Sequence, residues 1–215
     1  ASGGPLYKMN INKFQKVTVN EALKHPNWKM GRKITIDSAT MMNKVFEVIE
    51  AKNIFNVNYD RISILTHPKS YVHAIIKFQN GLSKFLVHDP DMTIPIYNSI
   101  YFKKEKCFNS KPLDLNTLNN LNLMKIKKNR FPLVKLLDKL PNQSSLFETV
   151  LITVNDYLVH KFLDKKINFQ KLTKLIYKIS NQKEFQKFKK IRPKNLKEIY
   201  NLRDYVHLKL DTLGI

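Results

Sequence analysis

A helical repeat of apolar residues in the second half of the sequence restricts the fold more than any other feature. From Phe131 onward, apolar side chains recur with the spacing of one helix face, and Pro141 and Pro193 interrupt the repeat. The repeat predicts helices over roughly 131–140, 145–164, 168–180 and 194–210. Short connections favour antiparallel packing of such helices, so residues 130–215 are expected to form a small α-helical bundle.

The first half carries strand signals instead. Runs at 61–65 and 72–78 are rich in β-branched and aromatic residues, and Asn80-Gly81 is a strong signal for a tight hairpin turn. Residues 82–87 would return as the partner strand, and 94–102 would be helical. These patterns together predict an α+β fold.

The predicted order of domains follows from this change of pattern. Residues 1–101 would form an antiparallel-sheet domain with flanking helices. The polar, Asn-rich segment 102–129 is expected to be a linker arm that leads into the bundle over 130–215.

The segment 24–50 combines a loop, a short predicted strand over 33–36, and a helix that Asp37 or Ser38 would cap and that would run to about Asn53. Upstream, Thr18 and Glu21 predict a capping box for a short helix that ends before His25. Ser38 would then lie near the positive end of the helix dipole, where phosphate binds favourably.

Three polar residues of this helix, Asn43, Lys44 and Glu47, are spaced to share one face. An amide, a cation and a carboxylate contribute little to a core. They suit a small, charged, oxygen-rich ligand with a metal nearby.

Two loops have alternative interpretations. The segment 25–31 places Trp28 and Met30 among turn-forming residues, so it is either a lid that closes over a ligand or a loop that Trp28 anchors to the core. The Ser2-Gly3-Gly4-Pro5 segment allows backbone N–H groups to approach an anion, although an ordinary turn is the simpler explanation.

Lysine accounts for most of the formal net charge of +21. Such an excess is typical of proteins that bind nucleic acid or anionic membranes. Here Lys accompanies abundant Asn, Ile, Phe and Tyr and few Gly, which favours a bias of the coding DNA toward A and T. A nucleic-acid binder would cluster Arg and exposed aromatic residues, so nucleic-acid binding through the basic bundle is the weaker hypothesis.

The sequence lacks paired cysteines and long apolar runs, and this limits the possible classes of protein further. Cys107 is the single cysteine, which excludes an intramolecular disulfide or a Cys-based zinc site and favours a reducing compartment. No run of about 18 apolar residues exists, so the sequence predicts no transmembrane helix and no membrane partner.

Several blocks in order and spacing resemble the 1-deoxy-D-xylulose 5-phosphate reductoisomerase family. They are Ser2-Gly3-Gly4-Pro5, the segment 25–31, the segment 36–44 with Glu47, His67-Pro68 and Pro90-Asp91-Met92. The resemblance is strong over residues 1–101 and weaker over 102–215. It implies NADPH-dependent rearrangement and reduction of 1-deoxy-D-xylulose 5-phosphate to 2-C-methyl-D-erythritol 4-phosphate in the non-mevalonate isoprenoid pathway, with Mg²⁺ or Mn²⁺.

The resemblance also implies roles for individual residues. Glu47 would be a metal ligand, and Glu47, Lys44 and His25 would form the catalytic set. The implied substrate-binding residues are Ser2, His25, Ser38, Asn43, Lys44 and Glu47. Trp28 and Met30 would belong to the lid, and Gly31 would lie where the lid approaches the cofactor.

The family has an N-terminal Rossmann-like NADPH domain, a central catalytic domain and a C-terminal bundle. No Gly-rich dinucleotide fingerprint occurs in this sequence. The chain is therefore expected to begin partway through the catalytic domain, without two of the three metal carboxylates, and to be inactive alone. The resemblance further implies a homodimer in the bacterial cytoplasm or in a plastid-like organelle.

The sequence departs from the family at several positions. Val45 replaces a usual Gly directly after Lys44, which raises the hypothesis of a crowded site or a shifted helix. The other departures are Lys69, Tyr101-Phe102 and the segment 152–156. Val45 and the altered segment 152–156 motivate an alternative in which the chain is a degenerated, non-catalytic structural or dimerising remnant.

Overall fold

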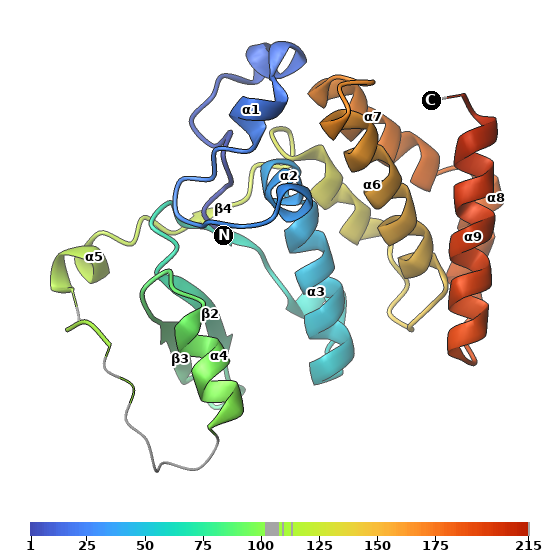
Figure 1. Cartoon of the computed structure of the whole chain (residues 1–215). Helices are drawn as coiled ribbons and strands as arrows, with labels where there is room; N and C mark the ends of the chain where they lie inside the picture. The colour runs from blue at the N-terminus through green and yellow to red at the C-terminus, as the bar shows by residue number, and fades with distance from the viewer. Residues whose placement is uncertain (102–107, 109, 113, 215) are drawn as a thin grey trace.

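The computed structural model describes residues 1–101, 108, 110–112 and 114–214. The single cysteine, Cys107, and Phe102 of the Tyr101-Phe102 pair lie outside the described residues. No helix among the described residues is both long and apolar enough to cross a membrane. Figure 1 shows helices α2 and α3 between a helical bundle on one side and a β-hairpin on the other.

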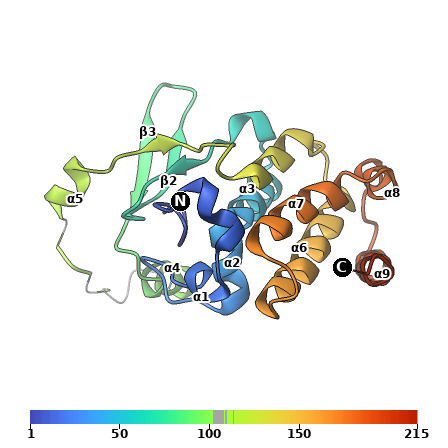
Figure 2. The same ribbon diagram turned by 90° about the horizontal axis from the view of Figure 1, so that it is seen from above.

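The helical bundle forms as the apolar repeat predicts. Its long helices are α6 (Phe147–Leu163), α7 (Phe169–Ser180) and α9 (Leu196–Thr212). The predicted first helix is a 3₁₀ helix, η3 (Pro132–Lys139), and the short helices α8 (Lys183–Gln186) and η4 (Lys187–Lys190) were not predicted. From above, α7 and α9 lie on either side of α6 (Figure 2).

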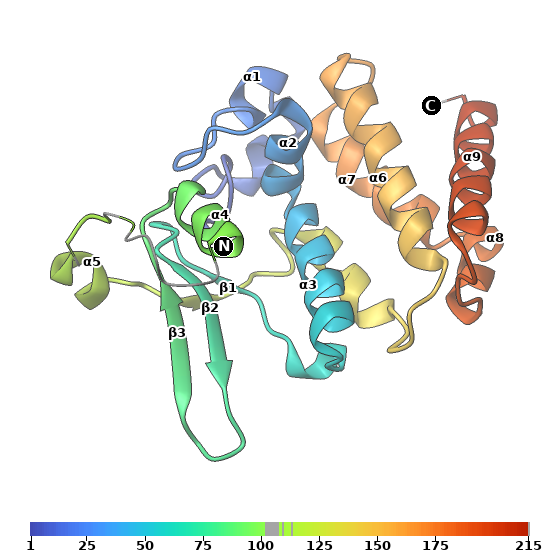
Figure 3. The ribbon, with the colours of Figure 1, turned by 60° about the horizontal axis from the view of Figure 1, so that its bottom comes forward.

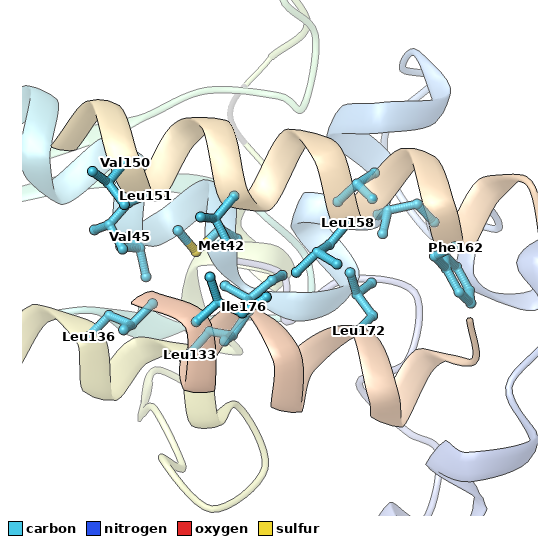
Figure 4. Packing of buried hydrophobic residues seen from close by; sticks show 14 of the residues in the cluster. Met42, Val45, Leu133, Leu136, Val150, Leu151, Leu158, Phe162, Leu172 and Ile176 are labelled. Carbon is cyan, nitrogen blue, oxygen red and sulfur yellow. The ribbon is translucent and has the colours of Figure 1, made fainter. Parts of the chain in front are cut away.

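One main core joins the bundle to α3. It combines Met42 and Val45 of α3 with Leu136 of η3 and with Val150 and Leu151 of α6, all nearly inaccessible to solvent. Figure 4 shows these side chains meeting between the helices, with Leu158, Leu172 and Ile176 continuing the same layer. The polar residues of α3 are thereby held on a rigid support.

The predicted strand over 33–36 and the single helix to Asn53 are wrong. Residues Arg32–Thr40 form a helix, α2, and Met42–Phe55 form a second, α3. Met41 between them adopts a left-handed conformation with φ of 63°, which is costly for a residue with a side chain. Its side chain is buried against Phe131 and Val134, and this packing holds the break in place.

The predicted hairpin is confirmed. Strands β2 (Val72–Lys77) and β3 (Ser83–Val87) pair antiparallel, and Gly81 in the turn has φ of 88°. The helix predicted over 94–102 is confirmed as far as Ile100, in α4 (Thr93–Ile100), and residue 102 lies outside the described residues. The hairpin projects from the rest of the chain, with α4 beside its base (Figure 3).

The expected strand over 61–65 is mostly wrong. Tyr59–Arg61 is a 3₁₀ turn, η2, and the strand β1 comprises only Leu65–Thr66. It pairs antiparallel with β4 (Met124–Lys125), from the segment expected to be a linker arm. That segment also contains the short helix α5 (Leu115–Asn119), so its described part is not wholly irregular.

The N-terminal segment covers one end of α2. It comprises the 3₁₀ helix η1 (Ile11–Lys16) and the short helix α1 (Val19–Ala22). The predicted capping box is present, since the Thr18 side chain accepts from the Glu21 N–H and the Glu21 carboxylate accepts from Thr18. Helix α1 therefore ends before His25, as expected.

Candidate functional site

The N-terminal loop and the loop over 25–31 meet at Ser2 and His25. The His25 Nε2 lies 3.3 Å from the Ser2 Oγ, and the Gly4 N–H donates to the same oxygen at 3.1 Å. Ser2 is buried, whereas His25 is half-buried. Two residues that are distant in the sequence thus form one polar pair.

Backbone contacts fix the protonation of His25. Its Nδ1 accepts from the N–H groups of Asn27 at 3.2 Å and Trp28 at 3.0 Å. The remaining proton of the neutral ring therefore lies on Nε2, which donates to Ser2. Burial lowers the pKa of His25 below its ordinary value, which favours this neutral form.

Asn27 ties the same loop to a second turn. Its side-chain amide donates to the Pro68 carbonyl at 2.7 Å and to the Ser70 hydroxyl at 2.9 Å. His67 holds that turn in place, because its Nε2 accepts from the Tyr71 N–H at 2.8 Å and its Nδ1 contacts the Leu121 carbonyl. The His67-Pro68 block of the sequence argument is therefore a scaffold for the loop.

The polar face predicted on α3 is present. The Lys44 ammonium and the Glu47 carboxylate form an ion pair, and Asn43 Oδ1 accepts from the Lys44 N–H at 2.8 Å. The Glu47 side chain is 51% exposed and that of Lys44 is 23% exposed, so both remain accessible to a ligand. Lys44 also lies near enough to His73 for its charge to lower that pKa, after the larger effect of burial.

Ser38 does not lie at a helix N-terminus, contrary to expectation. It is buried in the last turn of α2, before Met41 ends that helix. Gly4 packs directly on it: a Cβ at Gly4 would lie 2.4 Å from the Ser38 carbonyl oxygen. Gly4 therefore serves close packing on α2. Ser38 does not lie at the positive end of a helix dipole, so that dipole does not favour phosphate there.

The sequence analysis missed two imidazoles beside the loop over 25–31. The rings of His73 and His88 stack 3.5 Å apart, and Trp28 meets His73 edge-on at 6.3 Å. Trp28 is half-buried and faces these rings, while Met30 is also half-buried and Gly31 caps α2 at the surface. Neither histidine belongs to a pattern that spacing alone would have revealed.

A buried polar contact behind the site was also missed. Asp37 is 3% exposed, and its carboxylate accepts from the Asn155 amide of α6 at 2.8 Å. The Lys33 Nζ lies 2.9 Å from Asp37 Oδ2 and 3.6 Å from Asp156 Oδ1. The segment 152–156, which departs from the family pattern, thus supplies a polar contact between the bundle and α2. Burial nevertheless raises the pKa of Asp37.

The metal-ligating capacity of this arrangement is limited. The described residues contain no group of three or more His, Cys, Asp or Glu side chains that could hold a metal ion. Glu47 therefore belongs to no such group in the described part of the chain. Mg²⁺ binds few carboxylates and keeps several waters, so Glu47 is chemically suited to be one ligand among several.

Two models of protein families match the chain. The model described as 1-deoxy-D-xylulose 5-phosphate reductoisomerase C-terminal domain matches residues 1–55. The model described as DXP reductoisomerase C-terminal domain matches residues 88–207. Together they span both the candidate site and the bundle.

Curated relatives carry the same name. The 1-deoxy-D-xylulose 5-phosphate reductoisomerase of Pelagibacter ubique is 58% identical over all 215 residues, which cover 55% of its length. That of a Sulfurihydrogenibium species is 37% identical over 187 residues, which cover 87% of this chain and 50% of the relative. The chain thus spans about half the length of the curated relatives it matches.

Solved structures share the fold. A DOX-P reductoisomerase in complex with NADPH, fosmidomycin and magnesium aligns over 99% of this chain and 53% of its own, with a TM-score of 0.89 and 30% identity. The Zymomonas mobilis enzyme in complex with NADPH aligns over 99% of this chain and 54% of its own, with a TM-score of 0.85 and 29% identity.

Proposed function

The chain belongs to the 1-deoxy-D-xylulose 5-phosphate reductoisomerase family, and we propose that it supplies the substrate-holding part of that enzyme's active site. The whole protein would convert 1-deoxy-D-xylulose 5-phosphate to 2-C-methyl-D-erythritol 4-phosphate with NADPH. The observation that carries this proposal is the accessible face of Asn43, Lys44 and Glu47 on α3, a helix whose opposite side is locked into the core.

We assign the substrate's phosphate and oxygens to Ser2, Asn43 and Lys44 and, on the family resemblance alone, to the buried Ser38. Lys44 offers a positive charge that is now shared with Glu47, so an incoming phosphate would compete for the ammonium and release the carboxylate. Ser2 offers a hydroxyl whose orientation His25 and Gly4 fix before substrate arrives. Such preorganisation reduces the ordering cost of binding.

The cofactors are those bound by the solved relatives, NADPH and magnesium, with Mn²⁺ as the alternative ion. Glu47 would be this chain's carboxylate ligand, and Gly31 would adjoin the cofactor. A divalent cation, when bound, polarises the ketone and stabilises developing negative charge on oxygen. The chain's own contribution is to place Glu47 and Lys44 on one rigid helix, so that carboxylate and cation approach the substrate from fixed positions.

The loop over 25–31 would exclude water from the reacting carbons. Trp28 and Met30 supply its apolar surface, and Asn27 ties its central part to the turn at Pro68 and Ser70. His25 would touch substrate through Nε2, which is the nitrogen that carries the proton. In this form His25 can donate its single N–H to an oxygen of the substrate in place of Ser2.

The hairpin supports a homodimer. Its apolar side chains Ile76, Phe78, Phe85 and Leu86 are between 46% and 51% exposed, and the strand pairing puts Ile76 and Leu86 on one face and Phe85 on the other. An isolated two-stranded hairpin is marginal in water, so these apolar faces favour a covering partner, and we assign that partner to a second copy of the protein. On the same family resemblance, we propose that the protein acts in the bacterial cytoplasm or in a plastid-like organelle.

The test is metal-dependent oxidation of NADPH by the whole protein with 1-deoxy-D-xylulose 5-phosphate. Turnover is expected with Mg²⁺ or Mn²⁺ and would be lost on chelation. Lys44→Ala should mainly weaken binding of the substrate phosphate, and Glu47→Gln should weaken metal binding. If the folded whole protein shows no turnover with Mg²⁺ and none with Mn²⁺, the proposed activity is refuted and the non-catalytic remnant is favoured.

A further inference from the structure

A cavity of about 260 Å³ lies between η1, the end of α2 and α7, and it shares no residue with the candidate site. Apolar and aromatic side chains make up most of its wall. They include Ile11, Phe14, Phe131, Pro132 and Phe169. Its volume is somewhat below the roughly 300–1,000 Å³ of sites for drug-sized ligands, so a smaller molecule would fill it.

Arg130 contributes a positive charge to this wall. One guanidinium nitrogen, Nη2, donates to the Met9 carbonyl at 2.6 Å and also contacts the Leu6 carbonyl. Nε is buried and has no hydrogen-bond partner among the described residues. The guanidinium carbon lies 5.3 Å from the centre of the Phe14 ring and 5.7 Å from that of Phe131.

Among the described residues, no carboxylate forms an ion pair with Arg130. No Asp or Glu is among the residues that line the cavity, and Lys174 adds a second cation to it. Desolvation lowers the pKa of Arg130, and the nearby Tyr7 opposes this effect. A cation that is partly removed from water without a counter-charge is unfavourable, so an anion entering this cavity would remove a cost that is already present.

We propose that this cavity is a binding site for a small aromatic carboxylate, with Arg130 as its anchor and Lys174 as a second cation. The ring would pack among Phe14, Phe131 and Phe169, where aromatic pairs gain from edge contacts. The carboxylate would accept hydrogen bonds from the guanidinium N–H groups that do not already donate to the Leu6 and Met9 carbonyls.

Such a ligand would touch the junction of the two site helices. Ala39 and Thr40 line the cavity and connect Ser38 to the left-handed Met41. The ligand would therefore contact the residues that join the substrate-facing segments, although it would bind outside them. The proposal does not depend on the reaction that the whole protein performs.

Benzoate is a suitable probe, with benzyl alcohol as its neutral counterpart and acetate as the carboxylate without a ring. Titration of the purified protein, followed by ¹H–¹⁵N NMR, should shift the amide signals of Ala39, Thr40 and Thr173. The dissociation constant of benzoate should be at least about tenfold lower than those of benzyl alcohol and acetate. Equal affinities, or no binding of benzoate up to roughly 10 mM, would overturn the proposal.

Two variants separate the cavity from general charge effects. Thr173→Leu fills the cavity while leaving Arg130 in place, and it should weaken benzoate at least about tenfold. Arg130 also supports two backbone carbonyls, so Arg130→Met is informative only where the spectrum stays native. Lys178→Gln removes an exposed lysine of α7 outside the cavity and should leave benzoate affinity unchanged; an equal loss in both α7 variants would refute the site.

Discussion

The buried contact between Asp37 and Asn155 permits a quantitative test of how the bundle supports the site. Asn155→Asp keeps the size of the side chain but replaces the amide donor, 2.8 Å from the Asp37 carboxylate, with a second carboxylate. Two carboxylates at this separation cannot both be charged in a buried place, so the folded protein must take up one proton. The shared proton would then restore a hydrogen bond between them.

The cost of that proton sets the expected loss of stability. A carboxyl group with an ordinary pKa near 3.9 must be protonated at pH 7, and each pH unit costs about 1.36 kcal/mol, so the ceiling is about 4 kcal/mol. The nearby Lys33 ammonium attenuates the repulsion and makes about 3 kcal/mol a reasonable value at pH 7. Because the folded variant binds one proton more than the unfolded chain, its stability must fall as pH rises.

Urea unfolding of the wild type and variant between pH 4.5 and 7.5 tests this reasoning. The difference in unfolding free energy should shrink by up to about 1.4 kcal/mol for each unit of acidification. Burial raises the pKa of Asp37 in the wild type too, so that group's contribution is also present at low pH and lost as pH rises; the variant should exaggerate this trend. A difference that does not change with pH would refute the charge argument.

Ile152→Asp is the matched control for this experiment. It adds a carboxylate to the same helix, at a side chain that is 49% exposed. A solvated carboxylate there needs no extra proton, so the change in stability should be within about 0.5 kcal/mol and flat with pH. A steep pH dependence in this control would mean that charge on α6 in general, and not the Asp37 contact, determines the result.

Three further predictions use other contacts. Gly4→Ala should lower the unfolding free energy by about 2–4 kcal/mol in urea titration, because φ of Gly4 is 73° and the added Cβ would meet the Ser38 carbonyl. An unchanged unfolding free energy would contradict this close packing. Val45→Gly should cost about 2.5–4 kcal/mol by the same measurement, from lost burial and helix propensity, and a gain would mean that Val45 strains α3. Burial lowers the pKa of His25, so the loop contacts made by its neutral ring should be complete above about pH 6.5 and weaken as pH falls. The fluorescence emission of Trp28, the single tryptophan of this sequence, should change over the same pH range. Constant emission would mean that the His25 ring does not hold the loop.

Short-range sequence patterns predicted much of the fold. The apolar repeat located α6, α7 and α9 within a few residues, and Asn80-Gly81 located the hairpin turn. The face shared by Asn43, Lys44 and Glu47 followed from helix geometry alone. Each of these signals depends on neighbours within one or two turns, which a sequence displays directly.

Tertiary packing overrode local preference elsewhere. Ile34, Thr35 and Ile36 have β-branched side chains and indicated a strand, yet they form a helix in which Thr35 and Ile36 are buried. The left-handed Met41 has no local signal, because its conformation depends on packing against Phe131, 90 positions away. The contacts of Asn155 and of the stacked histidines likewise join distant segments, so no spacing rule could have located them.

The departure at Val45 illustrates how geometry changes the meaning of a substitution. Successive residues of an α-helix are rotated by about 100°, so Val45 lies roughly 200° from Asn43 and faces away from Glu47. In the structure its side chain is fully buried in the core that α3 shares with η3 and α6, not on the ligand face. A glycine there would leave a void beneath the helix that carries the polar residues. Val45 is therefore better explained as part of the support for that helix than as an obstacle to a ligand, and the reason for treating the chain as a non-catalytic remnant is correspondingly weaker.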